Sequence, residues 1–111
     1  MILIKIYKNG YENLGHARES VCHQVSLWHW ITSNMLLGLD DNAKEYSSHR
    51  DNPNNPSEGY SWATFNPDIN NLKWLFDDMV VSIRRWTEDI FNNDEVRIEW
   101  VDGFLIKDDV G

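Results

Sequence analysis

The chain has 111 residues, of which 41% are hydrophobic, and it carries a formal net charge of −8. This length predicts a single domain over residues 1–111, and this composition excludes a chain that is disordered throughout. The surplus of acid disfavours direct binding to nucleic acid or to an anionic membrane and favours a basic protein as partner. Six tryptophans accompany this charge, so either the core is rich in rings or some rings serve a partner.

The sequence indicates a reducing environment. Its one cysteine, Cys22, excludes an intramolecular disulfide. The sequence has no stretch of the ~20 apolar residues that cross a bilayer. The N-terminus also lacks the basic start and long apolar run of a signal peptide. We therefore expect a cytoplasmic protein.

The first predicted element is a β-hairpin. Residues 2–7 are rich in β-branched and aromatic side chains, and Asn9-Gly10 is a strong hairpin-turn signal. The returning strand is expected over residues 11–14.

A helix is expected next, because apolar residues recur at helical spacing. Ser20 would cap this helix and Gly38 would end it. Residues 21–31 also alternate as a strand would, but the length of the pattern and Gly38 favour a helix. The helical stripe consists of Val21, Val25, Trp28, Thr32, Met35 and Leu39.

Residues 40–66 are predicted to form a long connection that ends in a short strand over 60–65. Asn66-Pro67 then predicts the start of a second helix, which Asn92-Asn93-Asp94 would end. The apolar stripe of this helix consists of Ile69, Leu72, Phe76, Met79, Ile83, Trp86 and Ile90.

A second hairpin is predicted at the C-terminus, with strands over 95–101 and 104–107 around Asp102-Gly103. It would place Arg97 opposite Asp108. The order of elements predicts an α+β fold: an antiparallel sheet from the N- and C-terminal β-hairpins, with two amphipathic helices packed on one face.

The sequence contains no strong catalytic motif. His16, His23, His29 and His49 show none of the pair spacings typical of zinc ligands, so no metal and no cofactor is expected. A nucleophilic Cys22 would need a neighbouring base and an electropositive pocket. In so acidic a chain we instead expect an inert, partly buried thiol, and a protein that is not an enzyme.

The polar sides of both predicted helices are interrupted by tryptophan. Trp74 and Val81 lie opposite the apolar stripe of the second helix, and Trp30 lies opposite the stripe of the first. These rings are either exposed or covered by residues 40–66. Tryptophan flanked by charge is typical of interface hot spots. The predicted partner-binding residues are Trp74, Asp77, Asp78, Val81, Arg85, Glu88, Asp89 and Trp30.

These surface features favour an immunity protein, an antitoxin that neutralises a basic toxin such as a nuclease by direct binding. One alternative is a phage-encoded anti-defence protein or nucleic-acid mimic. A second is a small enzyme with a site in residues 40–66, where His49, Arg50, Asp51 and Glu58 would supply the chemistry. An exposed Trp74 would equally serve a homodimer contact.

Overall fold

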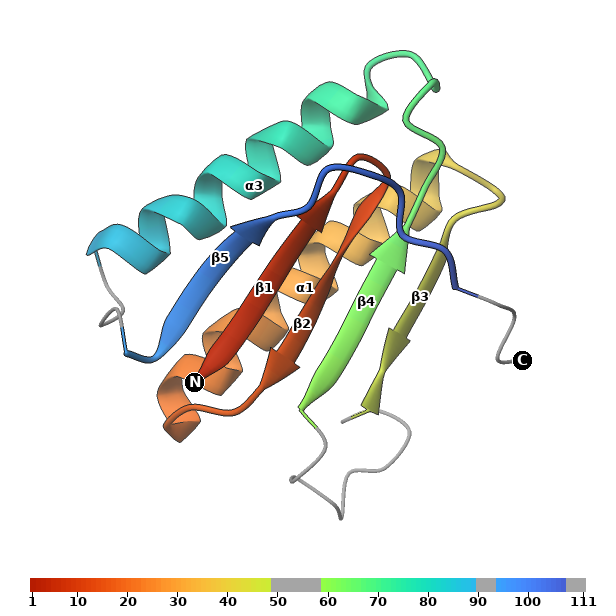
Figure 1. Cartoon of the computed structure of the whole chain (residues 1–111). Coiled ribbons are helices and arrows are strands. Elements are labelled where there is room, and N and C mark those ends of the chain that lie inside the picture. Colours follow the sequence, from red (N-terminus) through yellow and green to blue (C-terminus); the bar gives the residue numbers. More distant parts are fainter. Residues whose placement is uncertain (49–58, 90–93, 108–111) are drawn as a thin grey trace.

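Two helices pack on a five-stranded sheet in the computed structural model, which describes residues 1–48, 59–89 and 94–107 (Figure 1). The sheet has the order β3-β4-β2-β1-β5, with β5 parallel to β1 and all other neighbours antiparallel. The predicted α+β class is confirmed. The elements are β1 (Ile2–Tyr7), β2 (Gly10–Gly15), α1 (Glu19–Leu39), β3 (Lys44–Ser47), β4 (Tyr60–Thr64), α3 (Leu72–Asp89) and β5 (Val96–Trp100).

The N-terminal hairpin is confirmed, with its turn one residue earlier than predicted. Tyr7 pairs with Gly10, so Lys8 and Asn9 form the turn. Gly10 opens β2 with a φ of 153°, and a Cβ there would lie 2.0 Å from the carbonyl oxygen of Ala63. Glycine at this position therefore permits β2 and β4 to pair closely.

The first predicted helix is confirmed as α1, and the strand alternative is wrong. Arg18 precedes it as the N-cap residue without a capping side-chain hydrogen bond, so Ser20 lies inside the first turn. Gly38 lies in the last turn. Trp28 is 1% exposed, and its indole N–H donates to the carbonyl oxygen of Met79 at 2.7 Å. This bond ties α1 to α3 inside the core.

The second helix begins later than predicted. Asn66 starts a turn instead: its side chain accepts a hydrogen bond from the Asp68 amide at 3.0 Å, and its carbonyl oxygen accepts one from Ile69 at 3.2 Å. Asn71 then adopts a left-handed φ of 69°. A right-handed helix cannot pass through that conformation, so α3 begins at Leu72. Neither helix of the described chain combines the length and hydropathy needed to cross a membrane.

The predicted C-terminal hairpin is wrong. β5 pairs with β1, and residues 101–107 contain no strand. They cross the sheet on the face away from α1 (Figure 1). The Asn9 side chain holds this segment through two hydrogen bonds to the Leu105 backbone, at 2.7 and 3.0 Å. Asp108, the predicted partner of Arg97, lies outside the described residues.

The core lies between the sheet and the helices. Tyr11 of β2 is fully buried there, with its ring 4.6 Å from that of Trp28 and 6.2 Å from that of Phe76. The helix-facing residues of β1, Ile2, Ile4 and Ile6, complete this layer. The packing fixes the end of β2 relative to the start of α1, which is where the candidate site lies.

The outer face of the sheet carries a closed polar cluster around Glu12, which is 8% exposed. Its carboxylate accepts hydrogen bonds from Tyr7 and Tyr60, each at 2.6 Å, and pairs with Lys107 at 2.9 Å. Lys107 also donates to the Tyr60 hydroxyl. Burial alone would raise the pKa of Glu12, but the hydrogen bonds from Tyr60, Tyr7 and Lys107 outweigh it and lower that pKa. Burial, with the Glu12 contact, raises the pKa of Tyr7 to about 12.

Candidate functional site

A groove of about 440 Å³ opens at the end of the sheet where β2 leads into α1. The strands supply its floor, the first turns of α1 supply one wall, and the ends of β3 and β4 supply the other rim. The lining residues are Ile2, Asn13, Gly15, His16, Ala17, Glu19, Cys22, His23, Val25, Ser26, Ser47, Ser48, Gly59, Tyr60 and Ser61.

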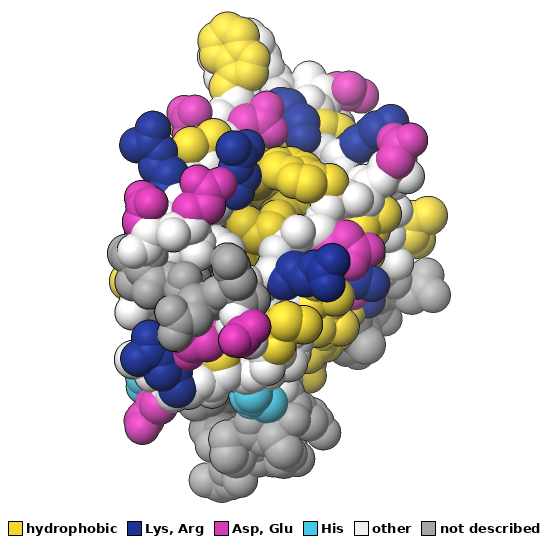
Figure 2. Space-filling view, turned by 60° about the vertical axis from the view of Figure 1, so that its left-hand side comes forward, with side chains coloured by type: hydrophobic (Ala, Val, Ile, Leu, Met, Phe, Trp, Pro, Cys, Tyr) yellow, Lys and Arg dark blue, Asp and Glu magenta, His cyan; other side chains and the backbone are white. Residues whose placement is uncertain are grey.

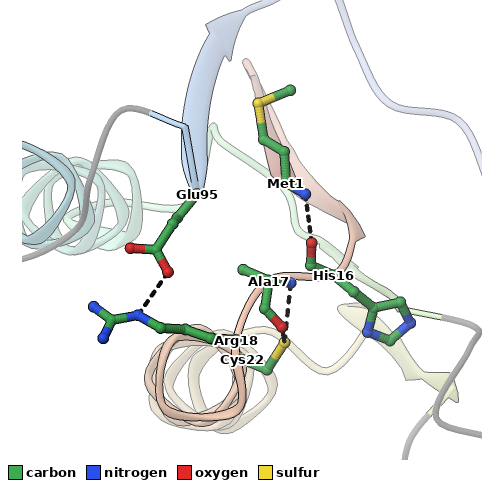
Figure 3. A network of polar contacts seen from close by, with 6 residues as sticks. All are labelled: Met1, His16, Ala17, Arg18, Cys22 and Glu95. Carbon is green, nitrogen blue, oxygen red and sulfur yellow. Dashed lines mark hydrogen bonds and ion pairs between the residues drawn. The ribbon is translucent and has the colours of Figure 1, made fainter.

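Cys22 is partly buried in this groove, near the start of α1. Figure 3 shows its sulfur against the backbone of Ala17. The thiol donates to the Ala17 carbonyl oxygen at 3.2 Å, and the Ala17 amide donates to the sulfur at 3.4 Å. The start of a helix and a backbone N–H both favour negative charge. The Ala17 backbone therefore fixes the Cys22 sulfur at the start of α1.

His16 lies directly after β2, and its ring is held by Gly59, the residue before β4. Its Nε2 accepts a hydrogen bond from the Gly59 amide at 2.8 Å. The contact is close: a Cβ on Gly59 would lie 3.0 Å from the ring and 2.0 Å from the Gly15 carbonyl oxygen. Because an imidazolium has no acceptor nitrogen, this bond requires a neutral ring with its proton on Nδ1.

A thiol and an imidazole therefore both line the groove, held by different backbone groups, and Figure 3 shows the His16 ring turned away from the Cys22 sulfur. Among the described residues no hydrogen bond joins the two side chains: Ala17 holds the sulfur, and Gly59 holds the ring. A second histidine, His23, lines the groove beside Cys22, and its Nε2 lies 3.7 Å from the Glu19 carboxylate. Such a groove can hold an extended ligand beside a nucleophile and a base.

Two features of the sequence disfavoured a site at His16 and Cys22. The two residues are six apart, and this spacing does not match the pairs typical of zinc ligands. The net charge of the whole chain does not describe the local field, because Glu19 is the one carboxylate among the described residues that line the groove. The sequence feature that indicates this site is His16 shortly after a predicted strand, followed by Cys22 in the first turn of the predicted helix.

The sequence left open whether the two predicted docking tryptophans are exposed or covered. In the structure Trp30 is 57% and Trp74 is 73% exposed. Figure 2 shows the side of the molecule where α3 and β5 lie, with hydrophobic side chains gathered in a hollow between charged ones. Two of the predicted carboxylates already pair with cations one turn away, Lys73 with Asp77 at 3.4 Å and Arg84 with Glu88 at 3.7 Å. Asp78, Val81, Arg85 and Asp89 are exposed on the same helix, and docking by these residues stays a prediction.

The residues predicted for a site in the long connection, His49, Arg50, Asp51 and Glu58, lie outside the described residues. Within the described ranges no group of three or more His, Cys, Asp or Glu side chains is placed to hold a metal ion. His29, one of the remaining histidines, is buried, and its Nδ1 lies 2.7 Å from the Tyr11 hydroxyl.

No family model matches the sequence, and no curated protein matches it in sequence. Among solved structures, the fold is similar to that of the essential ribosomal processing protease Prp from S. aureus, in complex with a covalently linked product peptide. The TM-score is 0.70 at 18% identity, over 91% of this chain and 100% of the protease chain. At this identity the match shows a shared fold.

The similarity corrects the functional prediction. A fold shared with a protease contradicts the predicted immunity protein and the expectation that the chain is not an enzyme. The small-enzyme alternative agrees better with it. Ser47, Ser48, Gly59 and Tyr60, from the stretch predicted to hold that enzyme's site, do line the groove. The fold and the groove together favour a functional site at the end of the sheet over one on the acidic face of α3.

Proposed function

We propose that this chain is a thiol peptidase in which Cys22 is the nucleophile and His16 is the general base. The observation that carries the proposal is that the sole cysteine of the chain and His16 line the same groove. The shared fold adds support, because the protease was solved with a covalently linked product peptide. A covalent bond between enzyme and peptide is what nucleophilic catalysis forms.

In the proposed reaction His16 takes the thiol proton, and the Cys22 sulfur attacks the carbonyl carbon of the scissile peptide bond. The C–S bond forms, the C–N bond breaks, and the imidazolium returns its proton to the leaving amine. A water molecule, deprotonated by His16, then hydrolyses the thioester and releases the carboxylic acid and the thiol. The Ala17 amide, 3.4 Å from the sulfur, would stabilise the thiolate.

The Gly59 contact sets a condition on this reaction. A protonated His16 ring carries N–H groups on both nitrogens, so it cannot accept the Gly59 hydrogen bond seen at 2.8 Å. His16 can therefore accept the Cys22 proton only after that contact is released and the ring has turned its free nitrogen towards the sulfur. The chemistry also requires a reduced thiol, in keeping with the predicted reducing, cytoplasmic compartment.

The test is cleavage of a defined peptide library, read by mass spectrometry, together with labelling by a peptidyl chloromethyl ketone. We expect cleavage and one label on Cys22 in the natural chain. Cys22→Ala should lose activity by a factor on the order of 10³ or more. His16→Ala should lose roughly 10²–10⁴-fold.

His23→Ala is the matched control, because His23 also lines the groove but pairs with Glu19. It should keep most of the activity. Cleavage that survives Cys22→Ala would overturn the proposal, and a larger loss in His23→Ala than in His16→Ala would reassign the base.

A further inference from the structure

Asn13 is a buried amide on the floor of the groove. It lies on β2, two residues after Tyr11 and three before His16, and it is 4% exposed. Since residues two apart on a strand point to the same face, Asn13 faces the helix side like Tyr11. Asn13 therefore sits where the hydrophobic core gives way to the groove.

The hydrogen bonding of this amide is incomplete. Its Nδ2 donates to the Ser61 hydroxyl at 3.0 Å. Its Oδ1 is buried and accepts no hydrogen bond from any of the described residues. A buried acceptor without a donor costs stability, and a valine or isoleucine on the same strand would avoid that cost. A buried acceptor of this kind, at the edge of a groove, is explained if a bound ligand supplies the hydrogen-bond donor.

The amide can present either of its polar atoms to such a ligand. Rotation about χ2 of asparagine has a broad, roughly two-fold profile, and a serine hydroxyl can both donate and accept. Ser61 can therefore hold either the nitrogen or the oxygen and leave the other for the groove. A peptide backbone offers both the donor and the acceptor that match this amide.

We propose that Asn13 positions the substrate by binding its peptide backbone in the groove. This inference rests on the proposed peptidase function and names a residue beyond Cys22 and His16. In the described structure Asn13 forms no hydrogen bond to Cys22 or His16, so we assign it as a positioning residue. Being anchored on the central part of the sheet, it would hold the peptide against a rigid floor while His16 moves.

The test compares Asn13→Val, and Asn13→Ala as a second variant, on the peptide that the natural chain cleaves fastest. We expect KM to rise about tenfold and kcat to stay within about twofold, because the contact serves binding and not the chemical step. Thr32→Val is the matched control: Thr32 also has a buried oxygen without a partner in the described structure, but it does not line the groove. Its KM should not change.

A binding measurement separates this inference from the proposed function. A pool of fluorescein-labelled decapeptides is titrated into Cys22→Ala and into Cys22→Ala with Asn13→Val, with circular dichroism confirming the fold. The double variant should bind about tenfold more weakly. If the natural chain cleaves nothing but this difference persists, the function fails and the role of Asn13 stands. Unchanged KM and affinity, or no binding by either variant, overturns the role of Asn13.

Discussion

Glu12 and Asn13 are neighbours on β2, yet their side chains lie in polar clusters of opposite character. Glu12 faces the outer side of the sheet and is bound by Tyr7, Tyr60 and Lys107. Asn13 faces the groove and leaves one amide atom without a partner among the described residues. The contrast indicates that the outer cluster serves stability and that the groove cluster is kept incomplete for a ligand.

The difference follows from what covers each face. The C-terminal segment crosses the outer face, with Leu105 bonded to Asn9 and Lys107 bonded to Glu12. On the other face, the start of α1 leaves a groove over Asn13. One strand therefore carries a closed and an open polar cluster on its two faces.

The largest expected effect is on the closed cluster. Glu12→Ala removes the common partner of two hydroxyls and an ammonium, so we expect the free energy of unfolding to fall by about 2–3 kcal/mol. Urea denaturation measures it. Glu99→Ala, an exposed glutamate on β5, is the control and should change stability by less than about 0.5 kcal/mol. Equal losses of unfolding free energy in Glu12→Ala and Glu99→Ala would show that Glu12 contributes no more to stability than an exposed glutamate.

Lys107→Ala should have a smaller effect of about 1 kcal/mol, because the lysine is partly exposed and both tyrosine hydroxyls still reach Glu12. Exposed Lys44 on β3 offers the control substitution, Lys44→Ala. The midpoint temperatures of thermal unfolding of Lys107→Ala and Lys44→Ala measure this difference in stability. If Lys107→Ala matches Lys44→Ala, the C-terminal segment is not held by this ion pair.

Acid should weaken the closed cluster. The pKa of Glu12 is lowered from 4.5 because the hydrogen bonds from Tyr60, Tyr7 and Lys107 outweigh burial. A lowered folded-state pKa gives stability that is present above the unfolded value and is lost as pH falls through the folded value. Urea titrations between about pH 3 and pH 6 should therefore show a steeper acid loss in the natural chain than in Glu12→Gln. If stability falls with pH equally in the natural chain and in Glu12→Gln, the lowered pKa of Glu12 does not contribute to acid sensitivity.

The smallest expected effect has the opposite sign. Asn13→Val removes an orphan acceptor and places a β-branched side chain on a strand, so stability should stay level or rise by up to about 1 kcal/mol. Chemical denaturation measures this change beside Glu12→Ala. A loss as large as that of Glu12→Ala would make Asn13 a structural residue and would remove the contrast between the two faces.

Local pattern was sufficient to predict much of the fold. The alternation in β1 and the helical stripes of α1 and α3 identified those elements, because each buries one face on a common core. Long-range pairing was not predictable in the same way. Asp102-Gly103 resembles a hairpin turn, but β1 offers β5 a free edge and Asn9, Glu12 and Tyr60 bind the segment that follows. The short strand β3 has too little alternation to stand out in residues 40–66.

The candidate site was harder to predict than the fold. Helical geometry placed Trp30 and Trp74 opposite the apolar stripes but left open whether residues 40–66 cover them; the structure leaves both rings exposed. The position of His16 and Cys22 in one groove depends on how the chain turns from β2 into α1, which neither residue reveals alone. Asn13 gave no signal at all, since one asparagine in a strand pattern has no distinctive spacing. Only the missing hydrogen bond distinguishes it.

The parallel pairing of β1 with β5 also has a consequence for how the chain acquires its fold. Residues 2–6 lie beside residues 96–100, so the inner strand β1 completes its pairing only after residues 96–100 have been synthesised. Contacts so distant in sequence close slowly, because the intervening chain must first be ordered. A nascent chain therefore holds β1 with one open edge until β5 has emerged and paired with it. Completion of the sheet would thus be a late step in folding.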